Sequence, residues 1–147
     1  MFQFEMESVL NYRAQIEEQC QLAFSDAMKR LQVARYVLED LKKEKNALIR
    51  HLIKIQENTL HPDVLQRHFA FIEYLKCKEE KQVAIICKME EEANAKREDL
   101  LEAVKKRKAM ETLREKKMAE YIFETAAKDR KELDDFAIIK FGNGMRK

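Results

Sequence analysis

Residues spaced alternately four and three apart run through the first third of the chain and are almost all apolar. The series is Met6, Leu10, Arg13, Glu17, Cys20, Phe24, Ala27, Leu31, Ala34, Leu38, Leu41, Lys45, Leu48, Leu52 and Ile55. A period of 3.5 residues sustained over about seven heptads is typical of the contact seam of a left-handed coiled coil. No glycine or proline interrupts the series. The pattern therefore predicts one long helix over about 4–57.

The single proline marks the one strong interruption. Residues 57–63 read ENTLHPD, with Pro62 followed by Asp63. Proline suits the first turn of a helix, and an acidic residue there complements the helix dipole. We therefore predict a turn at about 58–62, a second helix at about 63–140 and a frayed tail at 141–147, with Gly142 suited to a C-terminal cap. The second helix has its own, noisier seam: Ile72, Leu75, Glu79, Gln82, Ile86, Met89, Ala93, Lys96, Leu100 and Ala103.

The composition supports two long helices. The chain has 2 Gly and 1 Pro, where average usage would give about ten and about seven. With so few turn residues, a multi-stranded sheet or a Rossmann domain is excluded. The sequence predicts an all-α antiparallel coiled-coil hairpin, as a single domain over 1–147. One continuous helix in a parallel dimer is a weaker alternative, because Pro62 inside a helix costs about 3 kcal/mol. A turn near residue 60 places Met6 opposite residue 114 or so, and the end of the second helix must overhang, splay or pack elsewhere.

The charge and the cysteines give no sign of a strongly basic nucleic-acid or membrane binder, or of a disulfide-bonded protein. The formal net charge of +2 gives no strong field to attract nucleic acid or an anionic membrane. Cys20, Cys77 and Cys87 form no CxxC motif, which indicates free thiols in a reducing cytoplasm. No apolar run is long enough to insert into a membrane, and the N-terminus lacks the features of a signal peptide.

We expect no enzyme activity, cofactor or metal. A two-helix hairpin has a seam but no enclosed pocket in which polar groups could converge. His51, His61 and His68 flank the predicted turn without the pairing at i, i+4 that a helical metal site requires.

A basic block and three aromatic clusters remain as candidate surfaces. The basic block is Lys105, Lys106, Arg107, Lys108, Arg114, Lys116 and Lys117. It contains no aromatic residue for base stacking. The favoured interpretation is therefore a solvated helix face, followed by a docking surface for an acidic protein partner and then by a nucleic-acid-binding surface. The aromatic clusters are Phe69, Phe71 and Tyr74; Phe2, Phe4 and Tyr12; and Tyr121, Phe123, Phe136 and Phe141. They either contact partners or pack on one another at the ends of the hairpin.

Both ends of the chain resemble one family. The opening FQFEMESVLNYRAQIEEQCQ is similar to the N-terminal signature of FliJ-type flagellar export proteins, through Phe4, Leu10, Arg13, Glu17 and Glu18. The close, REKKMAEYIFETAAKDRKELDDFAIIKF, is similar to the family's C-terminal pattern, and Phe71, Ile72 and Leu75 match after the turn.

The resemblance implies a fold and a function. Members of the family resemble the coiled-coil stalk of the rotary ATPase gamma subunit. They associate with the hexameric export ATPase and the membrane export gate of the flagellar type III apparatus, and they are described as general export chaperone components. The resemblance therefore implies a cytoplasmic, non-enzymatic protein at the inner membrane.

The resemblance also assigns candidate binding residues. Those for the ATPase ring are Arg13, Glu17, Asp134 and Asp135, and those for the export gate are Phe71, Leu75, Lys78 and Gln82. For the polar seam residues Arg13 and Glu17, setting the register of the hairpin is an equal alternative. Two other functions stay open: the stalk of a virulence type III secretion system or of a rotary ATPase, and a generic coiled-coil adaptor or nucleic-acid-associated rod.

Overall fold

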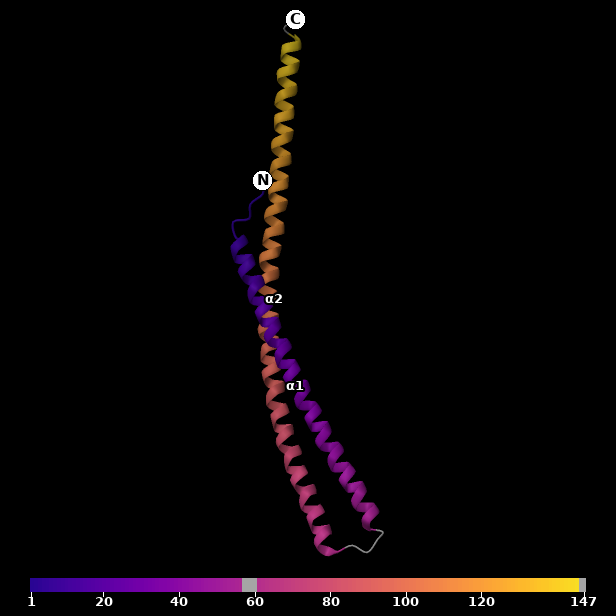
Figure 1. The fold of residues 1–147 in the computed structure, drawn as a ribbon. Coiled ribbons are helices and arrows are strands. Elements are labelled where there is room, and N and C mark those ends of the chain that lie inside the picture. The colour runs from indigo at the N-terminus through magenta and orange to yellow at the C-terminus, as the bar shows by residue number, and fades with distance from the viewer. Residues whose placement is uncertain (57–60, 146–147) are drawn as a thin grey trace. The chain divides into compact units, whose positions relative to one another are not determined.

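The computed structural model describes residues 1–56 and 61–145, which form two long helices and no strand (Figure 1). Helix α1 spans Glu7–Gln56 and helix α2 spans Pro62–Met145. The two helices run in opposite directions and pack against each other. The predicted all-α hairpin is confirmed, and the alternative of one continuous helix through Pro62 is wrong.

The start of α1 lies three residues later than the predicted position near residue 4. The backbone nitrogen of Glu7 donates a hydrogen bond to the carbonyl of Phe4 at 3.1 Å, which forms a turn before the helix. The residues before this turn are not helical, and the ring of Phe2 lies 5.5 Å from the ring of Tyr121, centroid to centroid. An aromatic contact with α2 therefore takes the place of another helical turn.

The start of α2 coincides with the single proline. Pro62 opens the helix, Asp63 lies in its first turn, and the carbonyl of His61 accepts hydrogen bonds from the nitrogens of Val64 and Leu65 at 3.1 and 3.3 Å. Pro62, which we placed in the turn, thus belongs to the helix. Residues 58–60 of the predicted turn lie outside the described residues.

The end of α2 lies beyond the position predicted at 140. The helix includes Gly142 and Gly144 and continues to Met145. Neither glycine adopts a positive φ, so neither forms the left-handed cap that would end the helix. The expected tail is therefore helical as far as Met145, and residues 146–147 lie outside the described residues.

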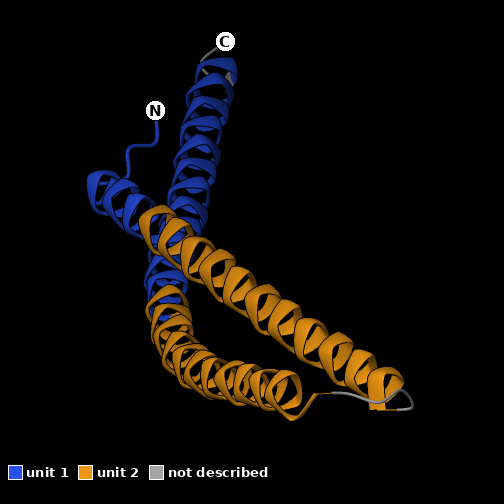
Figure 2. Ribbon diagram, turned by 60° about the horizontal axis from the view of Figure 1, so that its bottom comes forward, with its two compact units in different colours: residues 1–17, 102–147 blue, residues 18–101 orange. Residues whose placement is uncertain are grey.

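Packing divides the chain into two compact units (Figure 2). Unit 1 comprises Met1–Glu17 and Glu102–Lys147, and unit 2 comprises Glu18–Leu101. Each unit therefore pairs a segment of α1 with a segment of α2. That residues 1–147 form a single domain stays a prediction.

The core of unit 2 follows the predicted seams. Leu31, Ala34, Ile86 and Ala93 are buried together, and three further seam residues pack against them: Ala27, Leu38 and Met89. Every predicted seam position of α1 from Leu10 to Ile55 is buried or half-buried. A period read from the sequence thus identifies the packed face of α1.

The core of unit 1 is smaller. Leu10 and Ala103 are buried in it. The guanidinium Nε of Arg114 lies 3.3 Å from a carboxylate oxygen of Glu7. The pairing of the helices at this level agrees with the predicted position of Met6 opposite residue 114.

Candidate partner-binding surfaces

The polar seam residue Glu17 pairs with a residue of the basic block. A carboxylate oxygen of Glu17 accepts a hydrogen bond from the Nε of Arg107, and both side chains are largely buried. The Nη1 of Arg107 also lies 2.7 Å from a carboxylate oxygen of Glu111. Hydrogen bonds to Glu111 and Glu17 raise the pKa of Arg107 above its ordinary value. Glu17 thus holds a contact within unit 1, in agreement with a role in register.

Arg13 lies one turn before Glu17 and is half-buried. Its guanidinium carbon lies 6.0 Å from the centroid of the Tyr12 ring, at the outer limit of a cation–π contact. Arg13 therefore keeps part of its charge accessible at the surface of unit 1.

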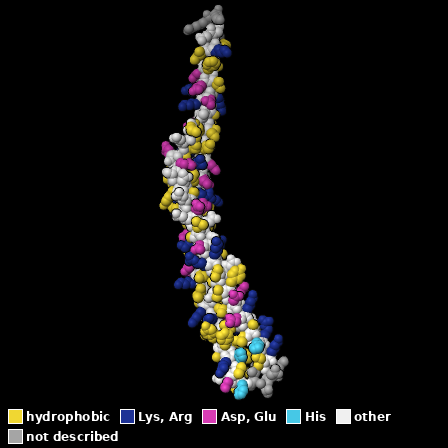
Figure 3. Space-filling model, viewed as in Figure 1, with side chains coloured by type: hydrophobic (Ala, Val, Ile, Leu, Met, Phe, Trp, Pro, Cys, Tyr) yellow, Lys and Arg dark blue, Asp and Glu magenta, His cyan; other side chains and the backbone are white. Residues whose placement is uncertain are grey.

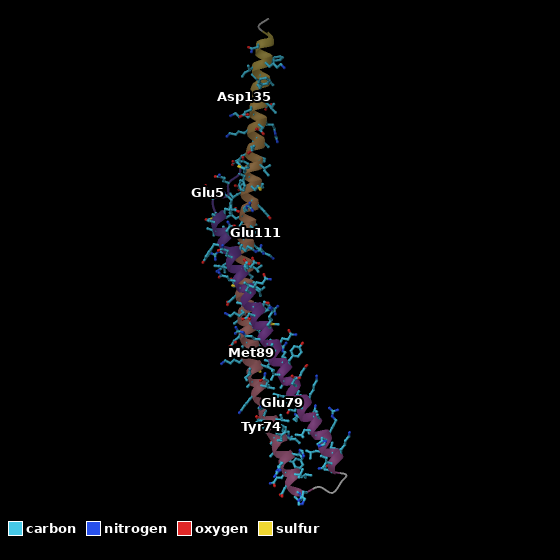
Figure 4. All side chains as sticks on the ribbon, viewed as in Figure 1. Glu5, Tyr74, Glu79, Met89, Glu111 and Asp135 are labelled. Atoms are coloured by element: carbon cyan, nitrogen blue, oxygen red, sulfur yellow. The ribbon has the colours of Figure 1, made fainter. Side chains whose placement is uncertain are left out.

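The end of α2 exposes apolar residues along its length. We define the C-terminal arm as residues 125–144, in which every described side chain is exposed. Its large apolar residues are Leu133, Phe136, Ile138, Ile139 and Phe141, each between 62% and 69% exposed. The candidate residues Asp134 and Asp135 lie on this arm and are exposed, and Figure 4 labels Asp135 on α2. The arm presents apolar and acidic groups together.

The N-terminal segment packs beside the base of this arm. A hollow of about 570 Å³ lies between residues 1–6 and the segment of α2 from Leu113 to Glu124. A hydrogen bond with the amino group of Met1 lowers the pKa of Tyr121 below its ordinary value. Phe2 and Tyr121 come from two different aromatic clusters and contact each other. For these two residues the alternative of internal packing therefore applies.

The candidate gate residues lie on unit 2, in two different environments. Phe71 is 43% exposed and Lys78 is exposed, whereas Leu75 is buried at 2%. Gln82 is half-buried, and its amide nitrogen donates a hydrogen bond of 2.9 Å to the backbone carbonyl of Ala34. Phe71 and Lys78 are therefore accessible, while Leu75 and Gln82 hold α2 against α1.

Tyr74 joins the two accessible gate residues into one cluster, which the resemblance did not include. Its ring lies 5.9 Å from that of Phe71, and the Nζ of Lys78 lies 4.8 Å from its centroid. A hydrogen bond with the Tyr74 hydroxyl raises the pKa of Lys78 above its ordinary value. The sequence already grouped Tyr74 with Phe71 in an aromatic cluster, and its spacing of four residues before Lys78 was the signal that could have added the lysine. We name Phe71, Tyr74 and Lys78 the aromatic–lysine cluster.

Four of the seven residues of the basic block form ion pairs. Arg107 and Arg114 pair with Glu17 and Glu7 of α1. Lys105 and Lys117 lie 3.8 and 3.5 Å from carboxylates one turn away on α2. Such pairs fit a solvated helix face, and the expectation that nucleic acid is not a partner stays a prediction.

Two of the three histidines, His51 and His68, lie close together, and the described residues form no metal site around them. The rings of His51 and His68 meet edge to face with centroids 6.1 Å apart. Within residues 1–56 and 61–145, no group of three or more His, Cys, Asp or Glu side chains is placed to hold a metal ion. Neither described helix has a stretch apolar enough to span a lipid bilayer.

A comparison with protein-family models identifies the family. The model of the flagellar FliJ protein matches residues 2–146. The chain belongs to the flagellar FliJ protein family. The resemblance noted at both ends of the sequence is therefore confirmed, and this FliJ-family chain is a protein of the type III export class.

A solved structure shares the fold. A protein described as a YscO homolog, CT670, from Chlamydia trachomatis is 19% identical to the FliJ-family chain, with a TM-score of 0.50. The match covers 100% of this chain and 99% of that one. No curated protein matches the chain. At this identity the solved structure supports the two-helix fold alone.

Proposed function

We propose that this protein is a non-enzymatic stalk and export chaperone component of the flagellar type III export apparatus. Its proposed location is the cytoplasmic side of the inner membrane, where it binds the hexameric export ATPase and the export gate. Family membership over residues 2–146 supports the proposal. The observation that carries it is the C-terminal arm, in which Leu133, Phe136 and Phe141 are about two-thirds exposed. A helix that exposes several large apolar side chains is typical of a surface that a partner covers.

The proposed contact with the ATPase ring lies on unit 1. Arg13, Glu17, Asp134 and Asp135 all belong to this unit. Asp134 and Asp135 are exposed and offer carboxylates directly, and Arg13 is partly accessible. We propose that Glu17 acts indirectly, because its carboxylate already binds Arg107.

The proposed contact with the export gate lies on unit 2. The accessible part is the aromatic–lysine cluster of Phe71, Tyr74 and Lys78. Leu75 and Gln82 hold this stretch of α2 against α1, Leu75 by its burial and Gln82 by its hydrogen bond to the backbone carbonyl of Ala34. Because the two proposed contacts fall on different units, one chain can engage both partners.

The proposed mechanism is mechanical. A stiff pair of helices held in a ring of six subunits contacts the subunits unequally. If it binds one conformation of a subunit more tightly than another, it shifts the population of that conformation and the affinity of its ATP site. The stalk thereby changes the rate of ATP hydrolysis without contributing a catalytic group.

An ATPase assay tests the ring contact. The purified export ATPase of the same organism should hydrolyse ATP faster when the protein is added. Exchanging Asp134→Asn together with Asp135→Asn should remove most of the stimulation. The matched control, Asp129→Asn with Glu132→Gln, removes the same charge from other positions of the exposed arm and should keep it. An ATPase that is indifferent to the native protein contradicts the proposed function.

A pull-down with the cytoplasmic domain of the gate protein tests the second contact. Phe71→Ala should weaken capture, while Phe69→Ala should not. Phe69 is a suitable control because it is 48% exposed and lies on a different face of α2 two residues away. Equal capture of both variants rules out the proposed gate contact.

The flagellar apparatus is favoured over a virulence secretion system because the matching family model is the flagellar one. Deletion of the gene should therefore abolish motility. Loss of effector secretion with normal motility supports the virulence alternative instead.

A further inference from the structure

An apolar groove lies between α1 and α2 in unit 2, beside the seam, whose residues Ala34, Gln82 and Met89 form part of its lining. It has a volume of about 420 Å³, and its walls are mainly Val33 and Val37 from α1 and Ile85 and Met89 from α2. We name it the unit 2 groove. Val33, Val37 and Ile85 are 63%, 43% and 45% exposed. Figure 3 shows hydrophobic side chains gathered on one face of unit 2, and Figure 4 labels Met89 on the stretch of α2 that lines the groove.

Packing within the hairpin does not account for Val33, Val37 and Ile85, which stay exposed. Val33 and Val37 lie outside the seam of α1, whose neighbouring positions Leu31 and Ala34 are buried against α2. The two valines are four residues apart on α1, as Ile85 and Met89 are on α2, so each pair forms a short stripe along its helix. Two apolar stripes that border a groove between two helices form a surface on which an additional, amphipathic helix can bind.

The charges beside the groove indicate which helix fits. On α2, Lys81 and Lys88 lie one turn before and after Ile85, and at the α1 wall Lys29 lines the groove. Among the described residues these three lysines form no ion pair within 4 Å. On the α1 side Asp40 lies one turn after Val37. A helix with acidic residues along the flank that faces α2 therefore complements this surface best.

We propose that the unit 2 groove binds an amphipathic helix of a partner protein, whose apolar stripe fills the groove and whose acidic flank faces Lys81 and Lys88. The proposal does not depend on the ATPase or gate contacts. Gln82, which also lines the groove, connects it to the aromatic–lysine cluster along the same side of α2.

A direct binding assay with the full chain tests this proposal. The probe is a fluorescent helix-forming peptide of about 18 residues, five turns of helix, with Leu and Ile on one stripe and Glu along the flanks. Three versions vary the register of the stripe. Fluorescence anisotropy should show saturable binding of at least one version. Replacing its flanking Glu residues by Lys should weaken binding at least about tenfold, because the lysines of the groove then repel the peptide.

Matched variants locate the site. Ile85→Glu should weaken binding of the Glu-flanked peptide at least about tenfold. Val83→Glu is the control, since Val83 is 44% exposed, almost the same as Ile85, but points to another side of α2. Lys81→Glu with Lys88→Glu should also weaken binding, whereas Lys42→Glu on the opposite face of α1 from Val33 should not. Circular dichroism at 222 nm establishes that each variant folds.

Each other result overturns the proposal. No binding of any version excludes an acidic amphipathic helix as the occupant. Equal loss in the Ile85→Glu and Val83→Glu variants means that the peptide binds elsewhere. If the protein alone sediments as a dimer and Ile85→Glu converts it to a monomer, the groove binds a second copy of the chain instead.

Discussion

The ammonium nitrogen of Lys45 on α1 lies 2.7 Å from a carboxylate oxygen of Glu79 on α2, and the two side chains are only 20% and 17% exposed. Both residues occupy seam positions, where most neighbours are apolar. Polar seam residues reduce stability in general but select one register, because any shift leaves them without a partner. Glu17 and Arg107 form the equivalent pair in unit 1. The polar seam residues Lys45 and Glu17 therefore each bind an oppositely charged residue of the other helix.

Breaking the Lys45–Glu79 pair from one side should destabilise the protein. Lys45→Met leaves the carboxylate of Glu79 largely buried without its partner, and we expect a loss of about 1–2 kcal/mol in the free energy of unfolding. The double variant Lys45→Met, Glu79→Leu removes both charges and should recover most of that loss. Urea denaturation followed by circular dichroism measures these values.

The exposed pair Arg35–Glu90 is the control for this experiment. Its atoms lie 3.2 Å apart, and its side chains are 54% and 45% exposed. Arg35→Met should therefore change the free energy of unfolding by less than about 0.5 kcal/mol. Similar losses at Lys45 and Arg35 would show that burial of the seam pair has no special role.

The sequence predicted the packed face of the hairpin but not its polar pairs. The period of 3.5 is a property of one helix, and so Leu31 and Ala34 were placed in the seam from α1 alone. Pairing Lys45 with Glu79 requires the register between two helices, which depends on the length of the connection after Gln56. The unit 2 groove was missed for a similar reason, since Val33 and Ile85 look like scattered surface residues until the helices are side by side.

Leu75 and Phe71 should respond differently to truncation, although the family resemblance assigned both to one binding patch. Leu75 is 2% exposed, and Leu75→Ala should lower the free energy of unfolding by about 2–4 kcal/mol through lost burial and a cavity. Phe71 is 43% exposed, and Phe71→Ala should cost less than about 1 kcal/mol. Urea denaturation of both variants checks this. Equal losses would contradict the assignment of Leu75 to packing and Phe71 to the surface.

The Tyr74 hydroxyl should control the protonation of Lys78. Its hydrogen bond raises the pKa of Lys78 in the folded protein, so the charged form is favoured. The contribution of this contact to stability is complete below the unfolded pKa of about 10.4 and is lost as the pH rises through the higher folded value. Tyr74→Phe removes the hydroxyl but keeps the ring, and should return the pKa of Lys78 toward its ordinary value. NMR titration of the Lys78 side chain in the native protein and in the variant measures the shift.

The candidate residues at the two ends show what a sequence pattern can and cannot assign. Unequal helix lengths predicted an overhang, and the exposed C-terminal arm agrees with it. The pattern could not show that Phe2 would contact Tyr121 while Phe136 stays exposed. That difference depends on the non-helical conformation of the segment before Glu7, which brings Phe2 to α2.

The C-terminal arm should exchange its backbone amides much faster than the core of unit 2. All described side chains of residues 125–144 are exposed, so no tertiary contact adds to the marginal stability of a helix in water. We expect exchange at least about 100-fold faster there than around Leu31 and Ile86, which are buried. Hydrogen–deuterium exchange read by mass spectrometry measures the difference. Adding the export ATPase should slow exchange in the arm if the ring covers it, whereas the variant Leu133→Ser, Phe136→Ser should show no slowing. Slow exchange in the free protein would mean that the arm already has a partner, such as a second chain, and is not available to the ring.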